Sequence, residues 1–161
     1  MRTRRSFLTW SVGALAICTT GASRAAAAQK VRFAIVVAKD SPISDIAFFE
    51  LKRLYKGETV NAAGKRLLPL NWLPLSDQRI RFDQAVLGMN PEAVSRYWID
   101  RRIRGQSGAP RSLEGPDLVQ RVAARLDGGI CYVQVSDVRA DVKIVRVDGK
   151  APRDPNYPIE Y

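Results

Sequence analysis

The sequence has no histidine among its 161 residues. Histidine is the usual general base for nucleophilic catalysis near neutral pH and the commonest metal ligand. Its absence excludes Ser-His-Asp triads, Cys-His dyads and nearly all zinc hydrolase sites. Acidic residues are present, but no pair falls at a spacing that marks a site. We therefore expect a protein that is not an enzyme, and no motif predicts a cofactor or a bound metal.

Acidic residues are absent from the first 28 positions, which have the features of an export signal. A basic start, Arg2, Arg4 and Arg5, is followed by an uncharged apolar stretch over residues 6–23 and by four alanines at residues 25–28. The run Thr3–Leu8, TRRSFL, fits a twin-arginine signal. We predict a cleaved signal over residues 1–28 and a periplasmic mature chain.

Two other interpretations of this segment are weaker. A transmembrane anchor is disfavoured because the apolar stretch is short and rich in Gly, Ala, Ser and Thr. A lipoprotein site at Cys18 is disfavoured because Ile17 stands where a small residue is required.

Cysteine is also scarce, and only Cys131 remains after the predicted cleavage. No disulfide can then form within the mature chain, and a lone thiol in an oxidising compartment predicts a buried side chain that packs rather than reacts. Cleavage also removes four arginines and lowers the net charge from +10 to +6. A basic surface favours a phosphate-type ligand, an anionic membrane face or an acidic protein. Aromatic residues do not alternate with basic ones as a nucleic-acid platform requires, so no nucleic-acid partner is expected.

The hydrophobic pattern predicts one α/β domain over residues 29–147. We expect strands at residues 31–38, 66–72, 130–135 and 142–147, and helices at 44–57, 76–88, 90–104 and 116–126. Pro69 predicts an edge position or a bulge in the second strand. Residues 58–65 are expected to form a hairpin-like loop. The proline-rich tail, residues 148–161, is expected to be an extended or disordered arm.

The segment Ile35–Gly57, IVVAKDSPISDIAFFELKRLYKG, combines an apolar strand, a Ser-Pro turn and an amphipathic helix that ends in Leu-Tyr-Lys-Gly. It resembles the substrate-binding proteins of bacterial phosphate ABC transporters, whose helix follows an Asn-Pro-type turn and ends in Ile-Phe-x-Gly. Gly128–Val133 likewise resembles the family's Gly-Ala-Ile-Gly-Tyr-Val strand, with Cys131 where glycine is usual. The likeness covers residues 33–138. It implies a single lobe of a periplasmic-binding-protein-like fold, with a mostly parallel or mixed sheet flanked by helices.

The resemblance also places a candidate anion site in Leu75–Phe82, LSDQRIRF. There the family has Gly-Ser-Gly-Thr-Arg, whose hydroxyls and backbone N–H groups hold phosphate at a helix N-terminus, a place that favours anions. Ser76 matches the serine and Arg79 the arginine, whereas Asp77 replaces a glycine and Gln78 the threonine. Asp77 would place a negative charge beside the phosphate or fill its position. In the alternative interpretation, Ser76 or Asp77 is an ordinary helix cap and Arg79 a solvated surface charge.

Two features of the following helix also allow more than one interpretation. The cluster Arg101–Arg104, RRIR, which Arg111 extends, would meet an anionic ligand or an acidic partner, or it is a solvated helix end whose cations suit the helix dipole. Tyr97 and Trp98 fall on the apolar stripe of the helix, so we predict core residues rather than a binding platform.

Two functions from different classes follow from these observations. The first is a periplasmic module that binds phosphate or another small anion in transport or sensing, through Ser76, Asp77, Gln78 and Arg79. A two-lobed receptor holds its ligand between the lobes, so a homodimer, a transporter, a receptor or a sensor domain would complete the cleft. The second is an accessory protein of a membrane complex that has lost ligand binding, because a shared fold does not transfer function.

Overall fold

The computed structural model describes residues 31–106 and 108–161. The predicted twin-arginine signal over residues 1–28 lies outside the described residues. Within the described ranges, none of the helices combines the length and the apolar character that crossing a membrane requires.

The described part of the chain builds a six-stranded mixed sheet with the strand order β2-β8-β1-β7-β5-β6. The strands are β1 (Phe33–Ala38), β2 (Asp45–Ile46), β5 (Leu68–Trp72), β6 (Arg111–Leu113), β7 (Gly129–Gln134) and β8 (Val142–Val147). Strand β1 is antiparallel to β7 and β8, whereas β5 is parallel to β6 and β7, and β2 is parallel to β8. A separate hairpin, β3 (Asn61–Ala62) and β4 (Lys65–Arg66), forms in the loop where one was expected.

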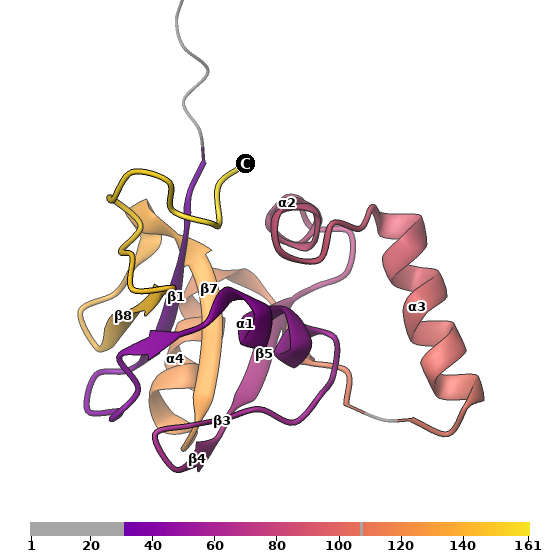
Figure 1. The fold of residues 1–161 in the computed structure, drawn as a ribbon, viewed down its shortest axis with the longest axis horizontal. Helices are drawn as coiled ribbons and strands as arrows, with labels where there is room; N and C mark the ends of the chain where they lie inside the picture. Colours follow the sequence, from indigo (N-terminus) through magenta and orange to yellow (C-terminus); the bar gives the residue numbers. More distant parts are fainter. Residues whose placement is uncertain (1–30, 107) are drawn as a thin grey trace, which may run out of the picture.

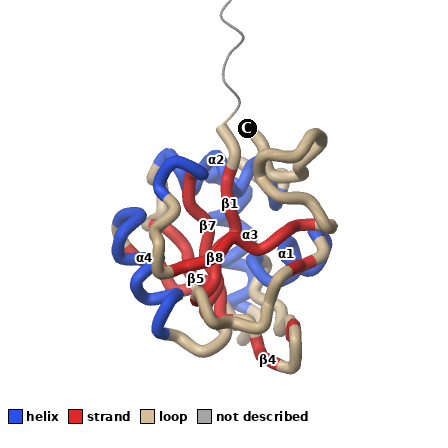
Figure 2. The backbone as a smooth tube through the Cα atoms, turned by 90° about the vertical axis from the view of Figure 1, so that its left-hand side faces the viewer, coloured by secondary structure: helices blue, strands red, loops and turns tan. Residues whose placement is uncertain are grey.

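Helices cover both faces of this sheet (Figures 1 and 2). Helix α4 (Gly115–Arg125) lies on one face, and α1 (Phe48–Tyr55) and α2 (Asp77–Phe82) lie on the other. Helix α2 continues as a π-helical turn, η1 (Asp83–Leu87), and a 3-10 turn, η2 (Val135–Asp137), follows β7. Helix α3 (Pro91–Ile103) stands away from the sheet, beyond α2 (Figure 1). The α/β class with a mixed sheet flanked by helices is confirmed.

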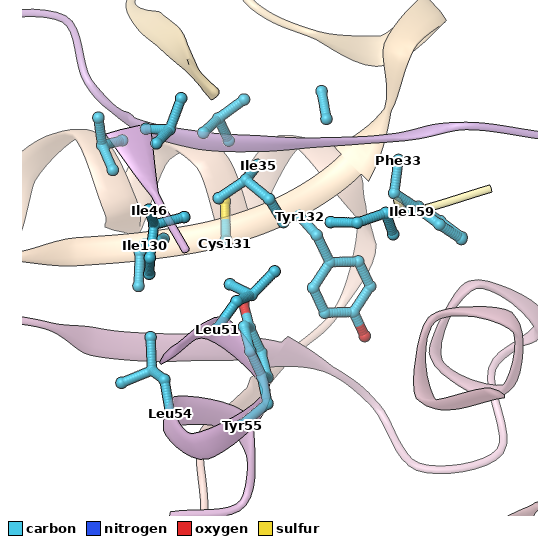
Figure 3. Close-up of a cluster of buried hydrophobic side chains, with 14 of the residues drawn as sticks. Phe33, Ile35, Ile46, Leu51, Leu54, Tyr55, Ile130, Cys131, Tyr132 and Ile159 are labelled. Carbon is cyan, nitrogen blue, oxygen red and sulfur yellow. The ribbon is translucent and has the colours of Figure 1, made fainter. Parts of the chain in front are cut away.

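An aromatic cluster fills the space between the sheet and the α1–α2 layer. The rings of Phe82 and Tyr132 stack with centroids 3.5 Å apart, and Phe33 meets both rings edge-on. Figure 3 shows Leu51 and Tyr55 of α1 pointing toward Tyr132 of β7. All five side chains are buried, and burial of each stabilises the fold by about 1.5–3 kcal/mol. This cluster fixes α2, and therefore the helix start at Ser76, against the sheet.

Helix α1 begins later than the sequence predicted. Asp45 and Ile46 pair with β8 instead of forming the first helical turn. The backbone N–H of Phe48 donates to the Asp148 carboxylate at 2.9 Å, so the helix start is stabilised by a residue 100 positions away. The residues around 44–48 do not reveal this distant partner, so their sequence alone places the helix start too early.

Strand β5 lies between β7 and β6, so the predicted edge position is wrong. Pairing to β6 covers only Leu70, Asn71 and Trp72, whereas Leu68 and Pro69 pair only with β7. Pro69 therefore stands where one side of the strand is unpaired, and the proline is tolerated there as it is at an edge. Strand β6 itself lies between two predicted helices, where no strand was predicted.

The C-terminal segment, residues 148–161, packs onto the domain, which corrects the expectation of an arm. Tyr157 is 2% exposed and Ile159 is fully buried in the core. Val31 and Tyr161 exchange two backbone hydrogen bonds of 2.9 Å each. The segment is rich in proline, and its apolar side chains are nevertheless buried in the core.

Replacing Ile159 with alanine is expected to destabilise the protein by about 2–5 kcal/mol, because the substitution leaves a cavity in a fully buried position. Urea unfolding of residues 29–161 measures this. Ile144→Ala is the matched control, since Ile144 is 39% exposed and its loss should cost far less. Equal effects of the two substitutions would show that the tail does not contribute to the core.

Candidate functional site

The candidate site starts where β5 ends, at the carboxyl edge that this strand shares with its parallel neighbours β6 and β7. Ligands of open α/β sheets bind outside this edge. The chain leaves Trp72, turns through residues 73–75 and reaches Ser76, the N-cap residue of α2, in extended conformation with φ −68° and ψ 146°. The prediction that a helix begins beside Ser76 is confirmed.

The start of α2 has no side-chain cap. The hydroxyl of Ser76 donates to the carbonyl oxygen of Leu73 at 2.8 Å instead of accepting from the first helical turn. The first N–H groups of a helix have no partner within the helix and carry its positive dipole end. The helix start therefore presents backbone donors suited to an anion.

The acidic residue of the predicted site points elsewhere. The Asp77 carboxylate pairs with Arg81 at 3.3 Å on the outer surface, and its side chain is 77% exposed. Asp77 thus does not fill the position of an anion, although its charge remains within the first turn. Gln78 is half-buried in the same turn.

Arg79 is buried, with 8% of the residue exposed, so the interpretation as a solvated surface charge is wrong. Its Nε donates to the Asp83 carboxylate at 2.5 Å, and Nη1 donates to the Trp72 carbonyl at 3.4 Å. Burial raises the pKa of Asp83 above its usual value, and the Arg79 guanidinium offsets part of that rise. The charge of Arg79 is therefore neutralised inside the chain. The i, i+4 spacing of Arg79 and Asp83 was the sequence signal for this pair.

A hydrogen-bonded tyrosine lies behind this pair. The Tyr132 hydroxyl donates to Asn71 Oδ1 at 2.5 Å, and the Trp72 N–H donates to the same oxygen at 3.0 Å. Burial raises the pKa of Tyr132 and of Tyr55 well above the usual value, so both stay neutral. These side chains hold the end of β5 in place.

A groove of about 360 Å³ lies between α2 and α3. Its lining is Pro74, Leu75, Arg79, Ile80, Asp83, Pro91, Val94, Ser95, Trp98, Ile99 and Arg102. On the other side of α3, the Tyr97 hydroxyl donates to the Lys56 carbonyl at 2.9 Å. Tyr97 and Trp98 are only half-buried, so the prediction of core residues is wrong: one anchors α3, and the other lines the groove. No pattern in the sequence predicted this groove.

The arginine cluster on α3 divides between two environments. Arg101 donates to the Gly57 carbonyl at 3.4 Å and lies over the Tyr97 ring, 5.8 Å from its centroid. Arg102 and Arg104 are exposed. Only part of the cluster is therefore a solvated helix end.

A second cavity, of about 510 Å³, lies at the end of β7 and is bordered by Arg32, Gln134, Ser136 and Arg153. Arg32 donates to the Pro152 carbonyl at 2.9 Å and pairs with Glu160 at 3.5 Å. Glu160 therefore neutralises the charge of Arg32 within the chain, as Asp83 neutralises that of Arg79.

The remaining candidate for a reactive group is the Cys131 thiol. Cys131 is fully buried, and burial raises the pKa of its thiol, which favours packing over reaction. Among the described residues, no three His, Cys, Asp or Glu side chains gather where they could hold a metal ion.

No protein-family model and no curated protein matches the chain. Solved structures do match it. An ABC-type phosphate transport receptor from Vibrio cholerae has a TM-score of 0.64 at 14% identity, over 81% of this chain and 54% of the receptor. A phosphate ABC transporter substrate-binding protein from Clostridium perfringens, with bound phosphate, has a TM-score of 0.64 at 18% identity, over 81% of this chain and 53% of that protein. The chain spans about half the length of these proteins, and it shares their fold.

Proposed function

We propose that this chain is a non-enzymatic periplasmic binding module of a transport or sensing system, and that its ligand is phosphate or another small anion. The uncapped start of α2 at Ser76 carries the proposal, because unpaired N–H groups and the helix dipole favour an anion there. The position at the carboxyl edge of parallel strands supports it. So does the fold shared with two phosphate receptors. Export through a twin-arginine signal at residues 1–28 belongs to the same proposal.

A second protein surface completes the site in this proposal. The chain corresponds to about half of each receptor, and a receptor cleft encloses its ligand from two sides. A second copy of the chain, a membrane transporter, a receptor or a sensor domain would supply the other side. Alone, the chain offers the N–H groups of the first turn of α2, because the Ser76 hydroxyl donates to Leu73 and the Arg79 charge is neutralised by Asp83.

Calorimetric titration of the mature protein with phosphate tests the ligand class. We expect weak binding, with a dissociation constant of about 1 mM or higher, which is about 4 kcal/mol of binding free energy or less. Asp77→Asn should tighten binding about 2–5-fold, because it removes a negative charge from the first helical turn. Asp127→Asn, at another exposed aspartate, is the matched control and should change nothing. A sub-micromolar dissociation constant would overturn the incomplete-site account.

The second candidate is an accessory protein of a membrane complex that has lost ligand binding. The Arg79–Asp83 pair favours it, because the side chain predicted to bind an anion is already engaged. In that case phosphate at tens of millimolar would produce no heat in the wild type or in Asp77→Asn, and capture of a partner would be independent of phosphate.

A further inference from the structure

We propose that the groove between α2 and α3 is a docking site for an acidic protein segment that inserts a large apolar side chain between the two helices. Ser76 does not line this groove, and docking there does not require an anion bound at the start of α2.

The shape and the lining of the groove favour an apolar insert. Leu75 and Ile80 contribute from the α2 side, and Val94, Trp98 and Ile99 contribute from the α3 side, around a hollow of about 360 Å³. The Arg79–Asp83 pair at this site is internally neutralised, so it offers little net charge to an incoming group. An apolar side chain that fills the hollow removes these surfaces from water, which is favourable in proportion to the area covered.

The rim of the groove also exposes large apolar side chains. Leu75 is 76% exposed, Ile99 is 53% exposed and Ile103, one turn further along α3, is 78% exposed. Leu75 has a φ of 65°, a left-handed conformation that is unusual for leucine. Exposed apolar side chains gathered beside a hollow and bordered by charge mark a protein interaction site, whereas scattered single ones do not.

The charge around α3 selects the partner. Over residues 91–111 the charged side chains are Arg96, Arg101, Arg102, Arg104 and Arg111 against Glu92 and Asp100. Arg96 and Arg102 stand three residues before and after Ile99, so they share its side of the helix. An acidic segment placed over Ile99 meets positive charge on both sides, which speeds association and fixes the orientation of the partner.

The same charges argue against other occupants. A second copy docked through this surface about a twofold axis would bring the arginines of both copies together, since such an interface uses the same patch twice. An anionic bilayer would neutralise the arginines, but a lipid surface has no protruding side chain that could fill a hollow between two helices. An acidic segment with a protruding apolar side chain satisfies both features.

A random peptide library displayed on phage and selected against the mature protein tests this. We expect the recovered peptides to be rich in Asp and Glu and to carry Leu, Ile, Phe or Met. Ile99→Ser/Ile103→Ser should weaken the binding of a recovered synthetic peptide at least 10-fold, whereas Phe49→Ser, at an equally exposed site on α1, should leave it unchanged. Arg102→Glu should weaken binding, and Arg146→Glu on β8 should not. Raising the salt concentration should weaken binding of the wild type, since charge contributes to it.

Four results would overturn the proposal: recovery of no peptides, recovery of peptides without an acidic bias, equal binding to the Ile99→Ser/Ile103→Ser variant, and self-association of the chain that the same double substitution abolishes. Thermal unfolding of each variant confirms that its fold is retained, as expected for exposed positions. Phosphate titration of the double variant separates the two proposals, because the start of α2 is unchanged and phosphate binding should persist.

Discussion

Replacing Arg79 with leucine is expected to lower the free energy of unfolding by about 3–5 kcal/mol at neutral pH. The substitution leaves the Asp83 carboxylate, which is 4% exposed, without its cationic partner in a site that burial already makes unfavourable for charge. Denaturant unfolding of residues 29–161 measures the loss. Arg81→Leu is the matched control: Arg81 lies two positions along the same helix in an exposed pair with Asp77, which is worth about 1 kcal/mol at most.

The cost of Arg79→Leu should depend on pH. Arg79 holds down the pKa of Asp83, so its removal raises that pKa further above the unfolded value. A carboxyl group with a raised folded-state pKa contributes stability that is present at low pH and lost as pH rises through the folded-state pKa. The deficit of the variant should therefore be smallest near pH 4 and largest at neutral pH.

The double variant Arg79→Leu/Asp83→Leu should recover most of the stability, because well-packed apolar residues replace a buried ion pair at little cost or with a gain. A loss that equals the sum of the two single losses would contradict the account of the pair as a self-contained unit. Such a result would mean that each residue has an independent partner.

Gly128→Ala is expected to prevent stable folding of the domain. Gly128 has a φ of 76°, and a Cβ built there would lie 2.1 Å from the Arg66 carbonyl oxygen, far inside any allowed contact. The clash is with backbone at the end of β4, two residues before β5 and next to the backbone hydrogen bond between Leu68 and Gly128, so relief requires moving the backbone that leads into β5. We expect a loss above about 4 kcal/mol, in the range reserved for severe structural defects.

Gly64→Ala separates the two causes of that loss. Gly64 has almost the same φ, 75°, but a Cβ there meets no atom within 4 Å. Its substitution should cost only the left-handed conformation, about 1–2 kcal/mol. Soluble expression and thermal unfolding of the two variants measure the difference, and equal stability would show that the close approach at Gly128 is relieved by a small shift.

Local signals in the sequence predicted the elements that depend on local chemistry. Asn90 is the N-cap residue of α3 and accepts from the Ala93 N–H at 2.9 Å, which confirms the predicted helix start at residue 90. Strand β8 has the predicted bounds, residues 142–147. The wrong predictions concern elements that depend on a partner far away in the sequence. Asp148 stabilises the start of α1, pairing with β5 makes residues 111–113 a strand, and hydrogen bonds between Val31 and Tyr161 hold the C-terminal segment against the domain.

The features of the candidate site also fall into those that depend on local sequence and those that depend on distant partners. The helix start at Ser76 is a local feature, and the sequence was sufficient to place it. The burial of Arg79 depends on the packing of α2 against the end of β5, and the groove depends on how far α3 stands from α2. The i, i+4 spacing of Arg79 and Asp83 signals the ion pair, but no pattern among neighbouring residues signals its burial or the position of α3. The side chain predicted to bind an anion is therefore half of an internal pair.

Anion binding at the start of α2 is tested most directly by NMR mapping of backbone amide shifts while phosphate is added to residues 29–161. We expect shifts centred on the amides of Gln78 and Arg79, with a midpoint of about 1 mM or higher. Shifts centred instead on the cavity beside Arg32 and Arg153, or saturation at micromolar phosphate, would contradict it.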